Sequence, residues 1–195
     1  GGVFLRFMNV LDFVLKIDNV LPHETCDELI KLFEESIYKD RMERQGYPNW
    51  TNLWICNDYP EVDQKLQNVY MTVARGYQTW LGVYGDHFNT NTFKFEGTNM
   101  KRYIGGTDDM YKRHADVGTL GTCKRYLAML FYLNDDFEGG ETIFYPEMSI
   151  RPKKGSVVVF PPYWLFPHEG TPVIKGRKYI MSNYCLLDNA DNGYS

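Results

Sequence analysis

Three residues of this 195-residue chain have the types and the order of a metal site: His114, Asp116 and His168. In a β-strand, residues i and i+2 point to the same face, so His114 and Asp116 could bind one ion together. A histidine from a distant strand would complete a set of two imidazoles and one carboxylate. That set is typical of non-haem Fe(II) centres that keep open coordination positions. The pattern therefore predicts oxygenase chemistry.

A basic residue stands ten positions after His168. Lys178 could hold the far carboxylate of a bound dicarboxylic acid, because burying that carboxylate unpaired would cost several kcal/mol. Lys175 and Arg177 compete for this role, and arginine is the better bidentate partner. Strand alternation puts Arg177 and Lys178 on opposite faces, so only one of them can point inward.

Other interpretations apply to the same residues. A His-x-Asp spacing is common by chance, and a lone histidine is more often hydrogen-bonded in a core or on a surface. Of the four histidines, His23 begins a helix and His87 follows a turn, which leaves two in the required order. Zn(II) could occupy the three ligands, but a structural zinc site is normally closed by a fourth protein ligand. Lys178 could also be an ordinary surface lysine.

The segments that must position these residues are helical first and β-rich later. A strand is expected within residues 12–20, a helix from Pro22, a polar loop over 38–52, and a helix from Pro60 that Gly85 ends. Further strands are expected at residues 92–104, 126–133, 142–145, 156–160 and 178–186. We expect one α+β domain over residues 1–195, with helical support at about 21–85 and an antiparallel double-sheet core at about 91–187.

Composition excludes several classes of protein. The net charge is −4 and 44% of the residues are hydrophobic, so no basic footprint argues for nucleic acid or an anionic membrane. No apolar run approaches the length that spans a bilayer. The four cysteines form no Cys-x-x-Cys pair and suit a reducing compartment. A cytoplasmic enzyme with no membrane partner is the expectation.

Six ordered segments resemble the prolyl 4-hydroxylase group of 2-oxoglutarate- and Fe(II)-dependent dioxygenases. They are residues 114–116 (HAD), 131–134 (FYLN), 138–146 (EGGETIFYP), 152–156 (PKKGS), 168–173 (HEGTPV) and 176–179 (GRKY). The resemblance covers roughly residues 100–186, and more loosely the entry to the first helix. It implies a double-stranded β-helix, or jelly-roll, core with supporting N-terminal helices.

The resemblance also implies roles for particular residues. His114, Asp116 and His168 look like the iron ligands, and Lys178 looks like the partner of the distal carboxylate of 2-oxoglutarate. Tyr103 and Thr142 look like further contacts of the cosubstrate. Those six residues are the expected catalytic, metal and cofactor-binding set. Fe(II), 2-oxoglutarate and O₂ are the implied cofactors, with ascorbate as a further candidate. Related halogenases replace the carboxylate ligand with a small residue, so the aspartate favours hydroxylation.

The implied activity is procollagen-proline 4-dioxygenase-like: hydroxylation of prolyl residues in a peptide or protein, with release of succinate and CO₂. Two departures concern the substrate: Tyr179 stands where the family often has tryptophan, and residues 42–50 lack the family's basic, hydroxyl-rich run. Arg44, Tyr47 and Trp50 are expected in a substrate loop that acts as a lid. The alternatives are a free amino-acid hydroxylase, a nucleic-acid demethylase of the same chemistry, and a non-catalytic cupin-like metal-binding module.

Overall fold

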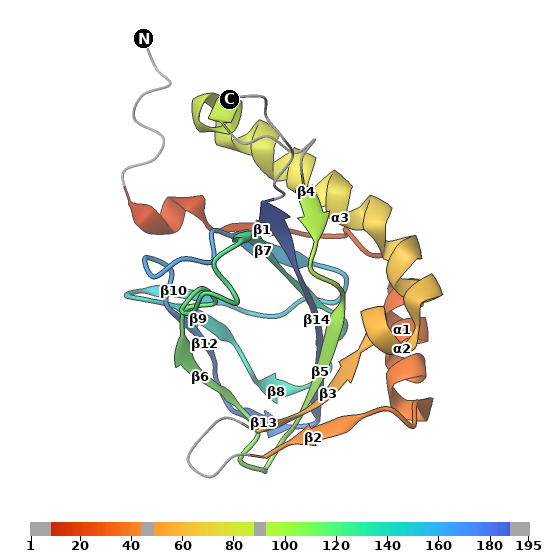
Figure 1. Cartoon of the computed structure of the whole chain (residues 1–195). Coiled ribbons are helices and arrows are strands. Elements are labelled where there is room, and N and C mark those ends of the chain that lie inside the picture. Colours follow the sequence, from red (N-terminus) through yellow and green to blue (C-terminus); the bar gives the residue numbers. More distant parts are fainter. Residues whose placement is uncertain (1–8, 44–48, 88–92, 188–195) are drawn as a thin grey trace.

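The structure, a computed structural model, describes residues 9–43, 49–87 and 93–187 (Figure 1). The helices are η1 (Val10–Phe13), α1 (His23–Glu35), α2 (Ile55–Asp58), α3 (Pro60–Leu81) and η2 (Gly82–His87), where η marks a 3-10 helix. The strands are β1 (Leu15–Ile17), β2 (Asp40–Met42), β3 (Trp50–Trp54), β4 (Phe93–Phe95), β5 (Asn99–Ile104), β6 (Tyr111–His114), β7 (Arg125–Tyr132), β8 (Glu138–Gly139), β9 (Thr142–Phe144), β10 (Met148–Ile150), β11 (Val157–Phe160), β12 (His168–Gly170), β13 (Val173–Lys175) and β14 (Arg177–Leu187).

The strands form two larger antiparallel sheets. The major sheet has the order β1-β11-β7-β14-β5-β3-β2, with β4 paired to β14, and the minor sheet has the order β10-β9-β12-β6. A short pair, β13-β8, lies beside them. Side chains from both larger sheets line one pocket, so the two sheets enclose it between them. The expected α+β jelly-roll with helical support is confirmed.

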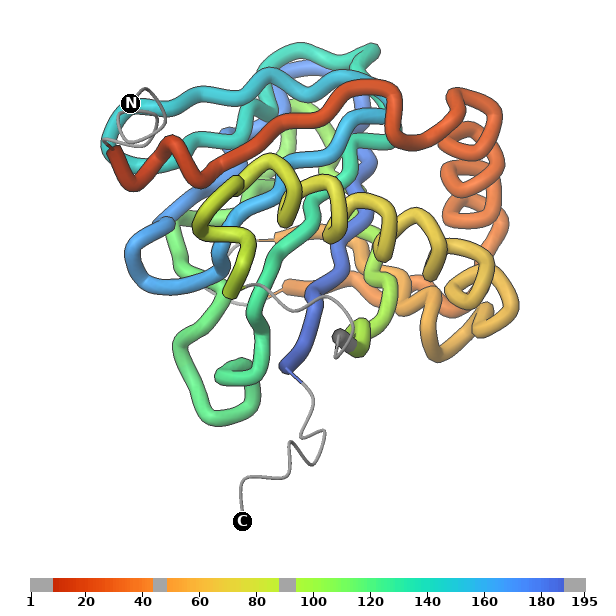
Figure 2. The backbone as a smooth tube through the Cα atoms, turned by 90° about the horizontal axis from the view of Figure 1, so that it is seen from above, coloured from red at the N-terminus to blue at the C-terminus, as the bar shows by residue number. Residues whose placement is uncertain are grey.

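The helices cover the outer face of the major sheet. Figure 2 shows α3 running across the strands of this sheet, and one hydrophobic cluster joins the buried faces of α1 and α3 to it. Helix α3 begins with Pro60, whose missing N–H costs nothing in the first turn. Its buried side chains follow the helical period: Leu66, Tyr70, Val73, Ala74, Tyr77 and Leu81. No described helix has the length and apolarity needed to cross a bilayer.

Three predicted boundaries were wrong in part. The strand expected over residues 12–20 is only Leu15–Ile17, with η1 before it. Helix α3 ends at Leu81 with Gly82 rather than Gly85 as its C-cap, because Gly82 adopts a φ of +60° that favours glycine. The polar segment 38–52 is not one long loop: β2 and β3 pair in it, and β3 continues the major sheet against β5. Sheet pairing stabilises this polar sequence, which periodicity alone does not show.

Strand β14 is the central strand of the major sheet and pairs with β7, β5 and β4. Its two faces have different roles. Tyr179, Met181 and Cys185 point to the helices and belong to their hydrophobic cluster. The residues that alternate with this set face the pocket between the sheets: Lys178, Ile180, Ser182 and Tyr184. The alternation predicted from sequence therefore holds along the strand that carries the candidate anion anchor.

Candidate active site

The two histidines meet because their strands are neighbours in the minor sheet. Strand β6 ends at His114, strand β12 begins at His168, and the two residues are paired in the antiparallel register. Their ring centroids are 4.4 Å apart. Asp116 is not on β6, as the same-strand prediction required; it lies in the bend just after the strand. Ligand atoms of all three residues still lie within 4.8 Å of one another.

Both imidazoles have their tautomer fixed by a backbone carbonyl. The Nδ1 atom of His114 is 2.8 Å from the carbonyl oxygen of Lys112, and that of His168 is 3.1 Å from the oxygen of Phe166. A carbonyl oxygen only accepts, so each Nδ1 carries the proton and donates it. The Nε2 lone pairs are then left for a metal ion, and the carbonyl partners orient each ring.

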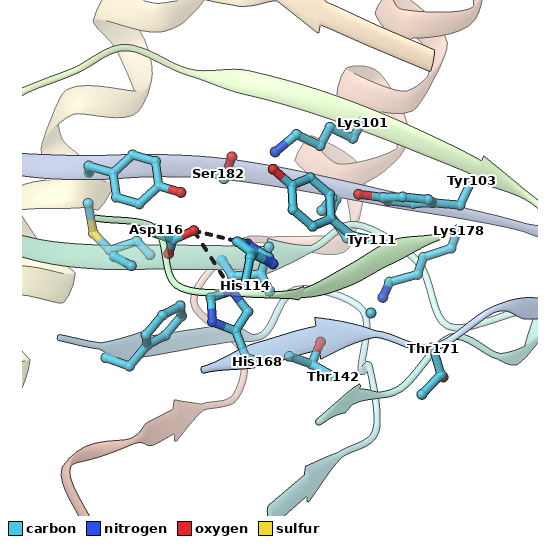
Figure 3. A pocket seen from close by; sticks show the side chains of 17 residues that line it. Lys101, Tyr103, Tyr111, His114, Asp116, Thr142, His168, Thr171, Lys178 and Ser182 are labelled. Carbon is cyan, nitrogen blue, oxygen red and sulfur yellow. Dashed lines mark ion pairs between the residues drawn. The ribbon is translucent and has the colours of Figure 1, made fainter. Parts of the chain in front are cut away.

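Those two Nε2 atoms point at one carboxylate oxygen. Asp116 Oδ1 lies 3.2 Å from Nε2 of His114 and 3.9 Å from Nε2 of His168, as the dashed lines in Figure 3 show. At these distances the Nε2 lone pairs and the negatively charged carboxylate oxygen repel each other, unless a proton or a cation lies between the nitrogen and the oxygen. A divalent cation with imidazole and carboxylate ligands satisfies all three groups and keeps positions open for other ligands.

Burial and charge set the ionisation of this cluster. The side chain of Asp116 is 7% exposed. Burial opposes ionisation of Asp116, but its two histidine neighbours and the charge of Lys101 prevail and lower the pKa of the carboxyl. Burial lowers the pKa of His168. An ionised carboxylate beside a neutral imidazole is the protonation state that a metal ion requires.

Lys178 reaches the pocket from β14 and is 4% exposed. Its Nζ atom donates to the carbonyl oxygen of Gly140 at 2.6 Å and lies 5.6 Å from the ring centroid of Tyr132 and 5.8 Å from that of Tyr103. No carboxylate of the described residues pairs with it. Burial lowers its pKa to about 8, although the charge of Glu141 opposes the shift. A buried ammonium with one neutral acceptor is a site for an anion.

The competing cations point elsewhere. Lys175 and Arg177 are exposed. The Nζ atom of Lys175 lies 3.9 Å from Oε1 of Glu138. The Nη1 atom of Arg177 lies 3.8 Å from Oε2 of Glu34. The structure thus brings Lys178 into the pocket and leaves the other two outside it. Gly140 gives the lysine its room, because a Cβ there would lie 3.2 Å from Cδ of Lys178.

The other two residues expected at the cosubstrate also line the pocket. Thr142 of β9 accepts a hydrogen bond from the buried hydroxyl of Tyr132 at 2.6 Å. Tyr103 is 5% exposed, and burial raises the pKa of its phenol well above the usual 10.0, so the hydroxyl stays a donor. The pocket has an empty volume of about 650 Å³, its open mouth included.

A second hollow of about 740 Å³ adjoins the first and shares six of its lining residues, His114 and Asp116 among them. Trp50, expected in a substrate loop, lies on β3 at the wall of this hollow and packs against Tyr111 with ring centroids 4.9 Å apart. Arg44 and Tyr47 lie outside the described residues. We call this second hollow the side groove.

Sequence reasoning missed part of the wall that the two hollows share. Lys101 and Tyr111 belong to both hollows and were not predicted as site residues. Lys101 stands two residues before Tyr103 on β5, so strand alternation from that expected site residue would have placed it on the same face. Tyr111 has no comparable signal, because β6 is short and was not predicted.

Comparison with known proteins agrees with this geometry. Residues 98–186 match the family model described as the 2OG-Fe(II) oxygenase superfamily. The match covers slightly less than half of this chain. The matched segment contains the three clustered candidate ligands and Lys178, and it begins one residue before β5.

Individual prolyl hydroxylases resemble this chain. Prolyl 4-hydroxylase subunit alpha-1 of Gallus gallus is 34% identical over 99 residues, which are 40% of this chain and 19% of that subunit. The chain thus spans about a fifth of that relative. The viral collagen prolyl hydroxylase of Paramecium Bursaria Chlorella virus-1, solved as a 2OG complex, is 25% identical with a TM-score of 0.67 and covers 91% of this chain and 97% of its own.

The fold extends to a more distant structure. A prolyl hydroxylase of Trichoplax adhaerens, solved with a peptide fragment of a hypoxia inducible factor, has a TM-score of 0.69 at 16% identity and covers 90% of this chain and 84% of its own. This likeness shows that the jelly-roll with its helical layer is the same.

Proposed function

We propose that this protein is a 2-oxoglutarate- and Fe(II)-dependent dioxygenase that hydroxylates prolyl residues of a peptide or protein. The observation that carries the proposal is the convergence of two Nε2 lone pairs and one carboxylate oxygen in a pocket that also holds the buried, unpaired ammonium of Lys178. The names of its relatives point to the same reaction class.

In this proposal His114, Asp116 and His168 hold the iron. Bound Fe(II), with 2-oxoglutarate and O₂, supplies the oxidising power and yields succinate, CO₂ and a hydroxylated product. The chain supplies position: the two backbone carbonyls accept from the Nδ1 atoms and so aim both Nε2 atoms at the metal, and the second carboxylate of 2-oxoglutarate pairs with Lys178. Tyr103 and Thr142 offer hydroxyl groups on the same side.

The chain also keeps water away from the reacting atoms. Phe144 and Phe160 pack against the His168 ring with centroids 5.2 and 4.9 Å apart, and neither is more than 2% exposed. Apolar walls of this kind strengthen the interaction of a buried cation with its carboxylate partners. A cupin-like module that only binds metal has no need of Lys178, which is why we favour an enzyme.

The side groove is the proposed place for the substrate. It opens beside the candidate ligands, and Trp50, Trp54 and Met42 give it the aromatic and apolar surface that an extended peptide uses. We further propose that the substrate residue is proline, that ascorbate serves as a reductant, and that the protein is cytoplasmic. The four cysteines are free thiols, which suits a reducing compartment.

The ligand assignment is tested by replacing His168. His168→Ala should abolish formation of succinate from 2-oxoglutarate, with the circular-dichroism spectrum retained. His87→Ala is the matched control, since His87 is an exposed histidine on η2. Turnover by the His168 variant at the wild-type rate would show that the iron is held elsewhere.

The substrate is tested by mass spectrometry. A peptide library, the free amino acids and oligonucleotides are incubated with Fe(II), 2-oxoglutarate and O₂, and products one oxygen atom heavier are sought. Hydroxylation confined to proline in peptides is the expected result. A product on free amino acids or on nucleobases alone would replace the prolyl substrate and keep the iron chemistry.

A further inference from the structure

A second, partly buried cation lies on the other side of the site from Lys178. Lys101 of β5 lines both the pocket and the side groove, and its Nζ atom lies 5.3 Å from the ring centroid of Tyr111 and 5.9 Å from that of Trp50. Among the described residues, no hydrogen-bond acceptor or ion-pair partner lies within reach of it. Figure 3 shows Lys101 and Lys178 on opposite sides of the Tyr103 and Tyr111 rings in this view.

The side chain directly across the strand pair from Lys101 is also an unpaired donor. Asn52 of β3 is paired with Lys101 in the register of β3 and β5, so both side chains leave the same face of the sheet. Asn52 is 3% exposed, and its Nδ2 atom has no partner. Its Oδ1 atom accepts from Nε1 of Trp50 at 3.2 Å. Because an indole N–H only donates, the amide cannot be turned around without losing this bond.

An unpaired acceptor completes the cluster. Asn99 stands two residues before Lys101 on the same strand face and is 6% exposed, and its Oδ1 atom has no partner. A buried amide oxygen or N–H without a partner costs about 1–3 kcal/mol. Two adjacent donors, one of them charged, and one acceptor thus line the side groove, and no described residue is bonded to them.

The charges of the side groove leave Lys101 unbalanced. Glu96 and Arg125 form a bidentate pair, with Nε of the arginine 3.1 Å from both carboxylate oxygens. Asp116 is shared by the two histidines and is committed to the candidate metal. After these groups are paired, the ammonium of Lys101 is the remaining charge among the lining residues.

We propose that Lys101 and Asn52 bind a carboxylate of the substrate, and that Asn99 accepts an N–H from the substrate beside it. The enzyme would then select targets with a carboxylate next to the carbon that is oxidised. Two sources supply this chemistry: an acidic side chain that flanks the target residue in a peptide, and the α-carboxylate of a free amino acid. This inference rests on the proposed function, because it assigns the substrate of that same site.

The test compares ligands that differ only in charge. The peptide pair is acetyl-Asp-Pro-amide and acetyl-Asn-Pro-amide, and the amino-acid pair is proline and prolinamide. Binding is followed by tryptophan fluorescence without O₂ on the protein loaded with Fe(II) and 2-oxoglutarate, since Trp50 lies beside the proposed subsite. In the wild type, the carboxylate member of one pair should bind at least about tenfold more tightly, the effect of one charge-assisted contact.

Variants assign that preference to Lys101. Lys101→Met should reduce the affinity ratio to within about twofold of one, and Asn52→Ala should reduce it partly. Lys65→Met is the matched control, an exposed lysine on α3 that should keep the wild-type ratio. If Lys101→Met does not fold, Lys101→Gln takes its place. The affinity ratio of the wild type tests the carboxylate preference without any variant.

The outcomes separate the two proposals. A wild-type ratio near one for both pairs, or a wild-type ratio kept by the Lys101 variants, overturns the carboxylate subsite even if 2-oxoglutarate is consumed. A preference in the amino-acid pair alone supports the subsite and assigns it to a free amino acid. Absence of succinate formation by the wild type with every ligand refutes the dioxygenase proposal instead.

Discussion

We predict that Lys178 destabilises the ligand-free protein at neutral pH. The side chain is fully enclosed and has a single neutral hydrogen-bond acceptor, so folding transfers its charge from water into a poorly solvating pocket. Its pKa falls from 10.5 to about 8 for this reason. Below pH 8 the folded protein therefore contains an ammonium that the unfolded chain would solvate better.

The sign and size of the effect follow from proton linkage. Between pH 8 and about 10.5 the unfolded chain binds more protons at Lys178 than the folded protein, so this residue makes stability rise with pH in that window. A difference of about 2.5 pKa units corresponds to about 3.4 kcal/mol. About 2.5 kcal/mol of this is realised between pH 7 and pH 10.

The assay is urea unfolding of the wild type and of Lys178→Met at both pH values. The wild-type free energy of unfolding minus that of the variant should increase by about 2.5 kcal/mol from pH 7 to pH 10. The hydrogen bond to Gly140 is lost at both pH values, so it cancels from this difference. At pH 7, 2-oxoglutarate with Mn²⁺ should raise the melting temperature of the wild type much more than that of the variant.

Lys175→Met is the control, because Lys175 is exposed on the neighbouring strand β13, and it should change stability by less than about 0.5 kcal/mol at either pH. Equal differences between wild type and Lys178→Met at pH 7 and pH 10 would refute the reasoning. The buried ammonium would then be solvated by a route that the structure does not show.

Two further predictions concern the framework. Glu34→Gln should destabilise the protein by about 1 kcal/mol at pH 7, because a partly exposed carboxylate that accepts from Arg102 at 2.7 Å is lost. Burial opposes ionisation of Glu34, but its hydrogen bonds prevail and lower the pKa of the carboxyl. The stabilisation is therefore present above pH 4.5 and disappears as the pH falls below it. Acid titration of the wild type and the variant would show this loss. Gly155→Ala should cost about 2 kcal/mol or more in thermal unfolding, because φ is +77° and the new Cβ meets the carbonyl oxygen of Leu21. An unchanged melting temperature would contradict the strained turn.

Much of the fold could be predicted because the signals are local. The helices at residues 23–35 and 60–81 were found from apolar residues at helical spacing and from proline at the first turn. The longer strands were found from β-branched and aromatic runs. The hairpin of β2 and β3 was missed because most of residues 38–52 are polar, and its place in the sheet depends on the pairing of β3 with β5.

The sequence by itself determined which residues could bind a metal and that Lys178 and Arg177 lie on opposite faces of one strand. Donor chemistry restricts the ligands to a few residue types, and the two-residue period of β14 separates Lys178 from Arg177. Tertiary structure alone decided that His114 and His168 face each other, because strand partners far apart in sequence are chosen by packing. It also decided that Lys101, Asn52 and Asn99 lie unpaired in one groove, since a side chain lacks a partner only when every neighbour around it is fixed.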